Sequence, residues 1–128
     1  MKNFNLEDHV NYVHLVGEVV RLEYRDRPSE SSYCIVLLEV ATEFKGKRHD
    51  PIKLKLIFWD SLAQALNEAN LKSRNSTPGD IINVEGRLTV RSKDGQLEYT
   101  VTGNKVKVLR RIDGKEPFLQ EIEKRETR

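Results

Sequence analysis

The chain has 128 residues, of which 38% are hydrophobic and 33% are charged. A chain of this length can bury one modest core and is too short for two domains. No stretch is long and apolar enough to span a bilayer, and the N-terminus lacks the apolar region of a secretion signal, so we expect a cytosolic protein. The net charge of +2 neither indicates nor excludes a polyanionic partner, because binding depends on where the cations lie.

The sequence divides into a short leading segment, one domain and a charged extension. Residues 1–9 are polar, residues 10–109 carry the pattern of strands, and residues 110–128 mix both signs of charge. In the extension, the spacing of apolar residues allows a short helix that begins near Pro117. The single cysteine, Cys34, lies in an apolar stretch and cannot form an internal disulfide, so we expect a buried structural thiol.

Two strands are predicted in the first third of the chain. From residue 10 to about residue 24 apolar and polar residues alternate, and the second face of this segment is also partly apolar. Such a strand can serve a barrel and an oligomer interface together. Residues 33–42 are apolar on both faces, which is typical of a central strand.

A basic hairpin tip follows, and it leads into a third strand at residues 52–59. An isolated basic tip of this kind is most often a solvent-exposed loop that only keeps the protein soluble. This one precedes a strand with further cations on its outward row, which favours contact with nucleic acid. The tip contains Phe44, Lys45, Lys47, Arg48 and His49, and the outward row contains Lys53, Lys55 and Trp59.

The hydrophobic period then changes from two residues to 3.6. One stripe of an amphipathic helix contains Leu62, Ala65, Leu66 and Ala69. Asp60 or Ser61 stands where a side chain can cap the first amides of this helix.

Two more strands are predicted after a turn at residues 78–80, and Asp94-Gly95 between them is a strong hairpin signal. Gly86 interrupts the inward row of the first of these strands and indicates a bend or bulge. The inward parity of the second switches, so we expect a bulge near Gly103-Asn104. Cations on the outward row and the hairpin suit a phosphate track, although charge pairing across strands explains them equally well. These cations are Arg87, Arg91 and Lys93.

Five strands with one short helix between the third and fourth is the order of the OB-fold, an all-β Greek-key barrel. Three segments carry a more specific resemblance: residues 11–19 (NYVHLVGEV), residues 58–63 (FWDSLA) and residues 78–88 (PGDIINVEGRL). In this order and spacing they resemble the bacterial single-stranded DNA-binding protein family. Each motif alone is weak, and the three together are fairly specific. The resemblance covers residues 11–109 and implies an OB-fold that binds single-stranded DNA in replication, recombination or repair.

In that family, exposed aromatic side chains stack on bases while Lys and Arg follow the phosphates. The resemblance places Trp59 on one such aromatic position and Phe44 on another. Lys53 and Lys93 stand where the family often has tryptophan, so charge replaces stacking there. We expect Tyr12, Tyr33 and Tyr99 to pack in the barrel or an interface. The expected nucleic-acid-binding residues are Phe44, Lys45, Lys47, Arg48, Lys53, Lys55, Trp59, Arg87, Arg91 and Lys93.

The resemblance also bears on partners. The acidic tail with which replicative members recruit enzymes is not found here, where the sequence ends Glu126-Thr127-Arg128. In this respect the chain is similar to tail-less relatives such as primosomal replication protein N, a dimeric helper of replication restart. A plasmid, phage or other mobile-element variant is equally open. We expect a homo-oligomer, a dimer or tetramer formed through the first strand and the neighbouring sheet surface, with single-stranded DNA and replication or restart proteins as partners.

Two other classes compete with this interpretation. The three histidines, His9, His14 and His49, have no partners at metal-ligand spacing, and neither a phosphate-binding loop nor a nucleophile motif occurs. We therefore expect no catalytic residue, cofactor or metal. A protein-assembly or restart-adaptor barrel with weak nucleic-acid binding stays open, and salt-dependent binding to an oligonucleotide separates it from the main hypothesis.

Overall fold

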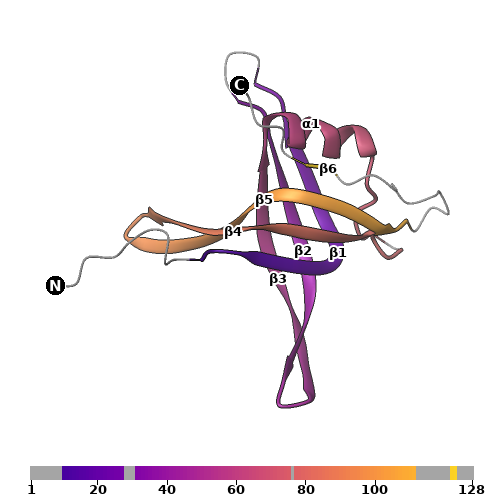
Figure 1. Ribbon diagram of the computed structural model, residues 1–128, viewed down its shortest axis with the longest axis vertical. Coiled ribbons are helices and arrows are strands. Elements are labelled where there is room, and N and C mark those ends of the chain that lie inside the picture. The colour runs from indigo at the N-terminus through magenta and orange to yellow at the C-terminus, as the bar shows by residue number, and fades with distance from the viewer. Residues whose placement is uncertain (1–9, 28–30, 76, 112–121, 124–128) are drawn as a thin grey trace.

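Five long strands and one helix, in the predicted order, make up most of the chain (Figure 1). The structure, a computed structural model, describes residues 10–27, 31–75, 77–111 and 122–123. The elements are β1 (Val13–Arg25), β2 (Tyr33–Phe44), β3 (Lys47–Trp59), α1 (Asp60–Ala69), β4 (Ile81–Lys93), β5 (Gln96–Arg110) and β6 (Ile122–Glu123).

The strands form one sheet in the order β3-β2-β1-β4-β5-β6, and neighbours in this order run antiparallel. A parallel pairing between β3 and β5, at Leu56 with Val101 and Ile57 with Thr102, closes the first five strands into a barrel. This pairing covers part of the edges that β3 and β5 would expose in an open sheet. The fold is the predicted OB-fold, with α1 between the third and fourth strands.

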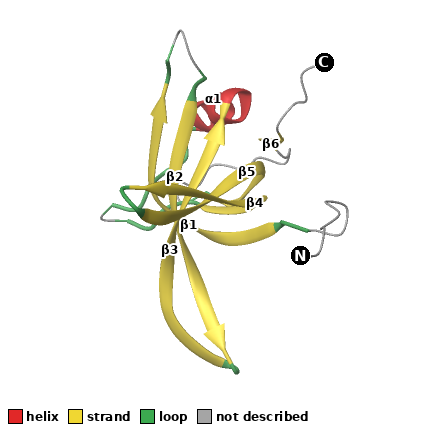
Figure 2. Cartoon of the chain, turned by 90° about the vertical axis from the view of Figure 1, so that its left-hand side faces the viewer, coloured by secondary structure: helices red, strands yellow, loops and turns green. Residues whose placement is uncertain are grey.

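Both hairpins extend beyond the barrel as arms. The β2–β3 arm points away from the end of the barrel that carries α1, and the β4–β5 arm projects in a different direction (Figures 1 and 2). The β2–β3 arm turns at Lys45-Gly46 and the β4–β5 arm at Asp94-Gly95, and all four residues have positive φ. Two positive φ angles match the twist of the flanking strands, which is why Gly follows Lys or Asp at each tip.

The core lies between the inner face of the barrel and α1. Phe58, Leu56 and Leu38 are completely buried there, and Leu62 and Leu66 of α1 cover them. Cys34 is also completely buried, so the prediction of a structural thiol is confirmed.

The helix begins differently from the prediction. Trp59 is the residue before the first turn, and no side chain caps the helix, so the cap expected from Asp60 or Ser61 is wrong. The backbone N–H of Asp60 instead donates to the carbonyl of Ser32 at 2.8 Å. This bond ties the end of β3 to the start of β2, and a side-chain cap is not needed to fix the helix start.

Two glycines allow β4 and β5 to bend at the corner of the barrel. Glu85 lies opposite Lys105 and Gly86 opposite Gly103, so Asn104 is an extra residue in β5. A Cβ atom on Gly86 would lie 2.1 Å from the carbonyl oxygen of Thr102, where no side chain fits. The bulges predicted from Gly86 and from the parity switch near Gly103 are confirmed.

Beyond β5, the short helix predicted from Pro117 falls mostly outside the described residues. Where the chain is described again, Ile122 and Glu123 form β6 and pair with Val106 and Lys105. Within the described ranges, no helix combines the length and apolar character that crossing a membrane requires.

Candidate nucleic-acid interface

The outward faces of β2 and β3 carry the first half of the candidate site. In both strands the even-numbered residues near the barrel point inward, so the odd-numbered residues face out. Tyr33 lies opposite Trp59 and Ile35 lies opposite Ile57 in the antiparallel register. Because these residues occupy one face, they form a half-exposed platform with an aromatic end and an apolar middle.

The polar face of the β4–β5 arm provides the second half. On this face Thr89 and Arg91 of β4 lie beside Thr100 and Thr102 of β5. The platform and the arm together line a groove with a cavity volume of about 400 Å³. Its lining residues are Arg27, Tyr33, Ile35, Lys55, Ile57, Trp59, Thr89, Val90, Arg91, Thr100 and Thr102.

Two aromatic rings meet at one end of this groove. The ring centroids of Tyr33 and Trp59 are 5.8 Å apart and the rings are tilted by 51°. The guanidinium carbon of Arg27 lies 5.0 Å from the centroid of the Tyr33 ring, which is a cation–π distance. The group therefore offers flat π faces next to a positive charge, the combination that binds stacked bases.

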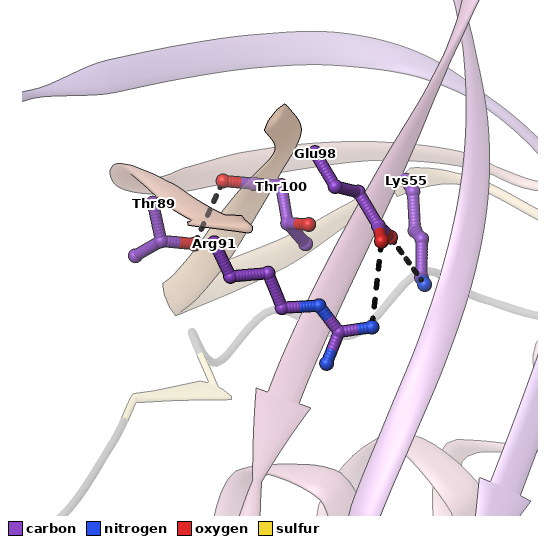
Figure 3. A network of polar contacts seen from close by, with 5 residues as sticks. All are labelled: Lys55, Thr89, Arg91, Glu98 and Thr100. Atoms are coloured by element: carbon purple, nitrogen blue, oxygen red, sulfur yellow. Dashed lines mark hydrogen bonds and ion pairs between the residues drawn. The ribbon is translucent and has the colours of Figure 1, made fainter. Parts of the chain in front are cut away.

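A carboxylate joins two cations of the groove (Figure 3). Lys55 Nζ donates to Glu98 Oε1 at 3.1 Å, and Arg91 Nη2 donates to Glu98 Oε2 at 3.5 Å. The hydrogen bond from Lys55 lowers the pKa of Glu98. Beside this network the hydroxyl of Thr89 donates to the carbonyl of Thr100 at 2.9 Å.

The residues predicted for the site separate into two groups. Three of them, Lys55, Trp59 and Arg91, line the groove. Lys53 and Arg87 are exposed on strands that border the groove, although neither lines it, and Lys93 is exposed at the end of β4.

The second group lies at the tip of the β2–β3 arm, at the opposite end of β3 from Trp59. Lys45, Lys47 and Arg48 are exposed there. The backbone of Phe44 pairs with Lys47, while the side chain of Phe44 is outside the described part of the structure. The predicted residues of β3 therefore lie at two places, the groove and the positively charged tip of the arm.

Most residues that line the groove were not among those predicted, and neither was Glu98 beside it. Tyr33, expected to pack in the barrel or an interface, has its ring beside Trp59, and Arg27 covers that ring. Glu98 lies opposite Arg91 in the hairpin register, a pairing that counting back from the Asp94-Gly95 turn identifies. The signal for Arg27 is weak, because it comes from a loop.

A different surface lies on the outer side of β1. Tyr12 and Val16 are exposed there, and residues 13–17 pair with β4 on one side while the described pairing with β2 begins at Glu18. The Tyr12 hydroxyl donates to Glu85, and His14 Nε2 is hydrogen-bonded to Asn83 Oδ1. This part of β1 therefore combines an accessible strand edge with exposed apolar side chains.

The described residues contain no cluster of three or more His, Cys, Asp and Glu side chains placed to hold a metal ion. The groove instead presents aromatic rings, hydroxyl groups and cations, which suit a ligand that is flat and anionic.

Comparison with solved structures finds proteins of similar fold, and three of them are described below. The SSB domain of a Synechococcus sp. protein matches with a TM-score of 0.53 and 24% identity, over 77% of this chain and 94% of that one. The N-terminal domain of PriB from Thermoanaerobacter tencongensis, a dimeric structure, matches with a TM-score of 0.50 and 23% identity, over 78% and 97% of the two chains. PriB from Ralstonia solanacearum matches with a TM-score of 0.56 and 16% identity, over 79% and 100%.

No protein-family model and no curated protein matches the sequence. The structural neighbours are thus SSB-domain and PriB proteins, the relatives that the three sequence motifs resemble. The chain has the OB-fold of SSB domains and PriB proteins.

Proposed function

We propose that this protein binds single-stranded DNA without strong sequence preference, in replication, recombination or repair in a bacterial, plasmid or phage setting. The observation that carries the proposal is the groove in which Tyr33 and Trp59 lie beside Lys55 and Arg91. The names of the structural neighbours, an SSB domain and two PriB proteins, support it.

Binding uses two kinds of contact. Bases stack on the rings of Tyr33 and Trp59, and each stacked base contributes about 1–3 kcal/mol regardless of its identity. Because the two rings are tilted by 51°, one base cannot lie flat on both, and successive bases use one ring each. Cations along the outward row of β3 neutralise the phosphates between the groove and the tip of the β2–β3 arm.

We also propose that two copies associate through β1, as a dimer or as a step toward a tetramer. The accessible edge at residues 13–16 can pair with the same edge of a second copy, and Tyr12 and Val16 would then be covered. The dimeric structure of the Thermoanaerobacter tencongensis PriB domain supports association into a dimer.

The first test is a titration with a labelled pyrimidine oligonucleotide at low and raised salt, followed by the emission of Trp59, the single tryptophan of the chain. We expect saturable quenching that weakens as salt rises, because stacking and phosphate contacts contribute together. Binding detected by mobility shift without quenching would remove Trp59 from the site. An absence of binding at low salt would overturn the proposal.

A protein-assembly or restart-adaptor module is the second candidate, and one observation favours it. The face of the β4–β5 arm opposite to the groove carries apolar side chains that are 43–63% exposed: Leu88, Leu97 and Tyr99. A contiguous exposed apolar surface is typical of a protein contact. If the oligonucleotide does not bind, this face becomes the first surface to test.

A further inference from the structure

Glu98 occupies an unusual place for an acidic residue, because it lies between two cations of a groove proposed to bind an anionic polymer. It comes from β5, whereas Lys55 comes from β3 and Arg91 from β4 (Figure 3). One carboxylate oxygen accepts from Lys55 and the other from Arg91, at 3.1 and 3.5 Å. Both oxygens of Glu98 are therefore engaged by side chains that line the groove.

A phosphate needs the same donors. It is anionic, as the carboxylate is, and accepts hydrogen bonds from Lys and Arg through similarly spaced oxygen atoms. Lys55 and Arg91 can bind a backbone phosphate only if they release Glu98 or share their hydrogen bonds with it. A phosphate that approaches the intact network also meets the negative charge of Glu98 at short range.

The network contributes little to the stability of the fold. The side chains of Glu98, Lys55 and Arg91 are 27%, 38% and 63% exposed. Ion pairs with this exposure are screened by water and salt and are worth little in folding. A contribution to stability therefore hardly explains why a carboxylate occupies this position. An effect on ligand binding explains it better.

We propose that Glu98 competes with nucleic-acid phosphates for Lys55 and Arg91 and thereby limits the affinity and the salt dependence of the groove. This inference rests on the proposed function. In the free protein the carboxylate holds the two cations away from phosphates, so stacking on Tyr33 and Trp59 carries a larger share of binding. Ligands that offer phosphates without accessible bases, such as duplex DNA, then gain little from the groove.

The test compares Glu98→Gln with the unchanged protein in oligonucleotide binding across a series of salt concentrations. Glutamine keeps the shape and removes the charge, so we expect about tenfold tighter binding at low salt. The plot of log affinity against log salt becomes steeper by about 1.4, because each of two further phosphates neutralised on a single strand adds about 0.7. Glu68→Gln is the matched control, since it removes one exposed acid from α1, outside the groove, and leaves affinity within about twofold.

A second measurement separates competition from a structural role. Lys55→Met is made in the unchanged protein and in the Glu98→Gln variant. If Glu98 holds Lys55, the lysine contributes little to the unchanged protein, and its loss weakens binding by no more than about twofold. In the Glu98→Gln background the same change weakens binding by about tenfold, because Lys55 is then available to phosphate.

The outcomes distinguish this inference from the function on which it rests. Equal affinity and equal salt dependence for Glu98→Gln and the unchanged protein, with both binding, would overturn the inference and leave the function standing. Weaker binding by a folded Glu98→Gln variant would show that Glu98 positions the cations for the ligand, which is the opposite role. If no form binds at low salt, the proposed function fails and the inference fails with it.

Discussion

The ring of Tyr33 lies 5.8 Å from the ring of Trp59, and the two are tilted by 51°. The residues are 26 positions apart in sequence and meet because β2 and β3 place them opposite each other at the end of the hairpin nearest to α1. Two aromatic planes at this angle form a corner that is open to solvent on the groove side. On the proposed function, this corner is where bases stack.

Removal of either ring should weaken binding to single-stranded DNA. Trp59→Ala and Tyr33→Ala should each cost about 1–3 kcal/mol in binding free energy, because each removes a stacking surface. The measurement is an oligonucleotide titration followed by fluorescence anisotropy. Tyr99→Ala is the matched control, since that ring is exposed on the opposite face of the β4–β5 arm. A cost for Tyr99→Ala as large as that for Trp59→Ala would contradict the assignment of the groove.

The cations at the tip of the β2–β3 arm should contribute charge without base contacts. In Lys47→Ala/Arg48→Ala we expect weaker binding to all sequences and a salt slope that is shallower by about 1.4, from two lost phosphate contacts. Lys72→Ala/Lys107→Ala removes the same charge from exposed positions outside both arms and serves as the control. An unchanged slope in the tip variant would exclude the arm from the DNA path.

Acid should weaken the fold through Glu18. The hydrogen bond from Arg74, with Nη2 at 2.6 Å from Oε1, lowers the pKa of Glu18, and the N–H of Gly79 also donates to this carboxylate at 2.7 Å. A depressed folded-state pKa means that the stabilisation is complete above the unfolded-state value and is lost as pH falls through the folded-state value. Melting temperatures of the protein and of Glu18→Gln should therefore converge as pH falls from 7 to 3. A constant difference across this range would show that the Glu18 charge does not stabilise the fold.

Cys34 should be unreactive in the native protein. Burial raises the pKa of its thiol to about 12, so almost no thiolate forms at neutral pH, and its side chain has no exposed surface. Ellman's reagent at pH 8 should detect no thiol in the native state and one thiol per chain in denaturant. Rapid reaction without denaturant would mean that β2 opens readily.

Gly103→Ala should destabilise the barrel. A Cβ atom at this position would lie 2.0 Å from a ring carbon of Phe58, which is completely buried. Overpacking of this kind costs about 1–3 kcal/mol, measurable by urea denaturation. A smaller residue at position 58 should relieve the clash, so Gly103→Ala/Phe58→Leu should cost less than the sum of the two single changes. Strict additivity would show that the ring moves aside freely.

The strand pattern and the positions of glycines were sufficient to predict the barrel, the helix position and the bulges at Gly86 and Gly103. The aromatic corner could not be predicted from the same information. Counting back from the Lys45-Gly46 tip pairs Tyr33 with Phe58, an inward residue. The irregularity in register between Val40 and Thr42 shifts this pairing by one residue, so Tyr33 meets Trp59 on the outer face. No turn or glycine in the sequence indicates that shift in register.

The two pairs that join β3 to β5 give the barrel a seam between its hairpins. Among the described residues, direct pairing between the two hairpins is confined to Leu56 with Val101 and Ile57 with Thr102. The groove lies over this seam, because Ile57 and Thr102 both line it. A nucleic-acid strand bound in the groove would contact both hairpins and hold them together. Ligand binding and closure of the barrel would then be coupled, so the protein with nucleic acid in the groove should unfold less readily than the free protein.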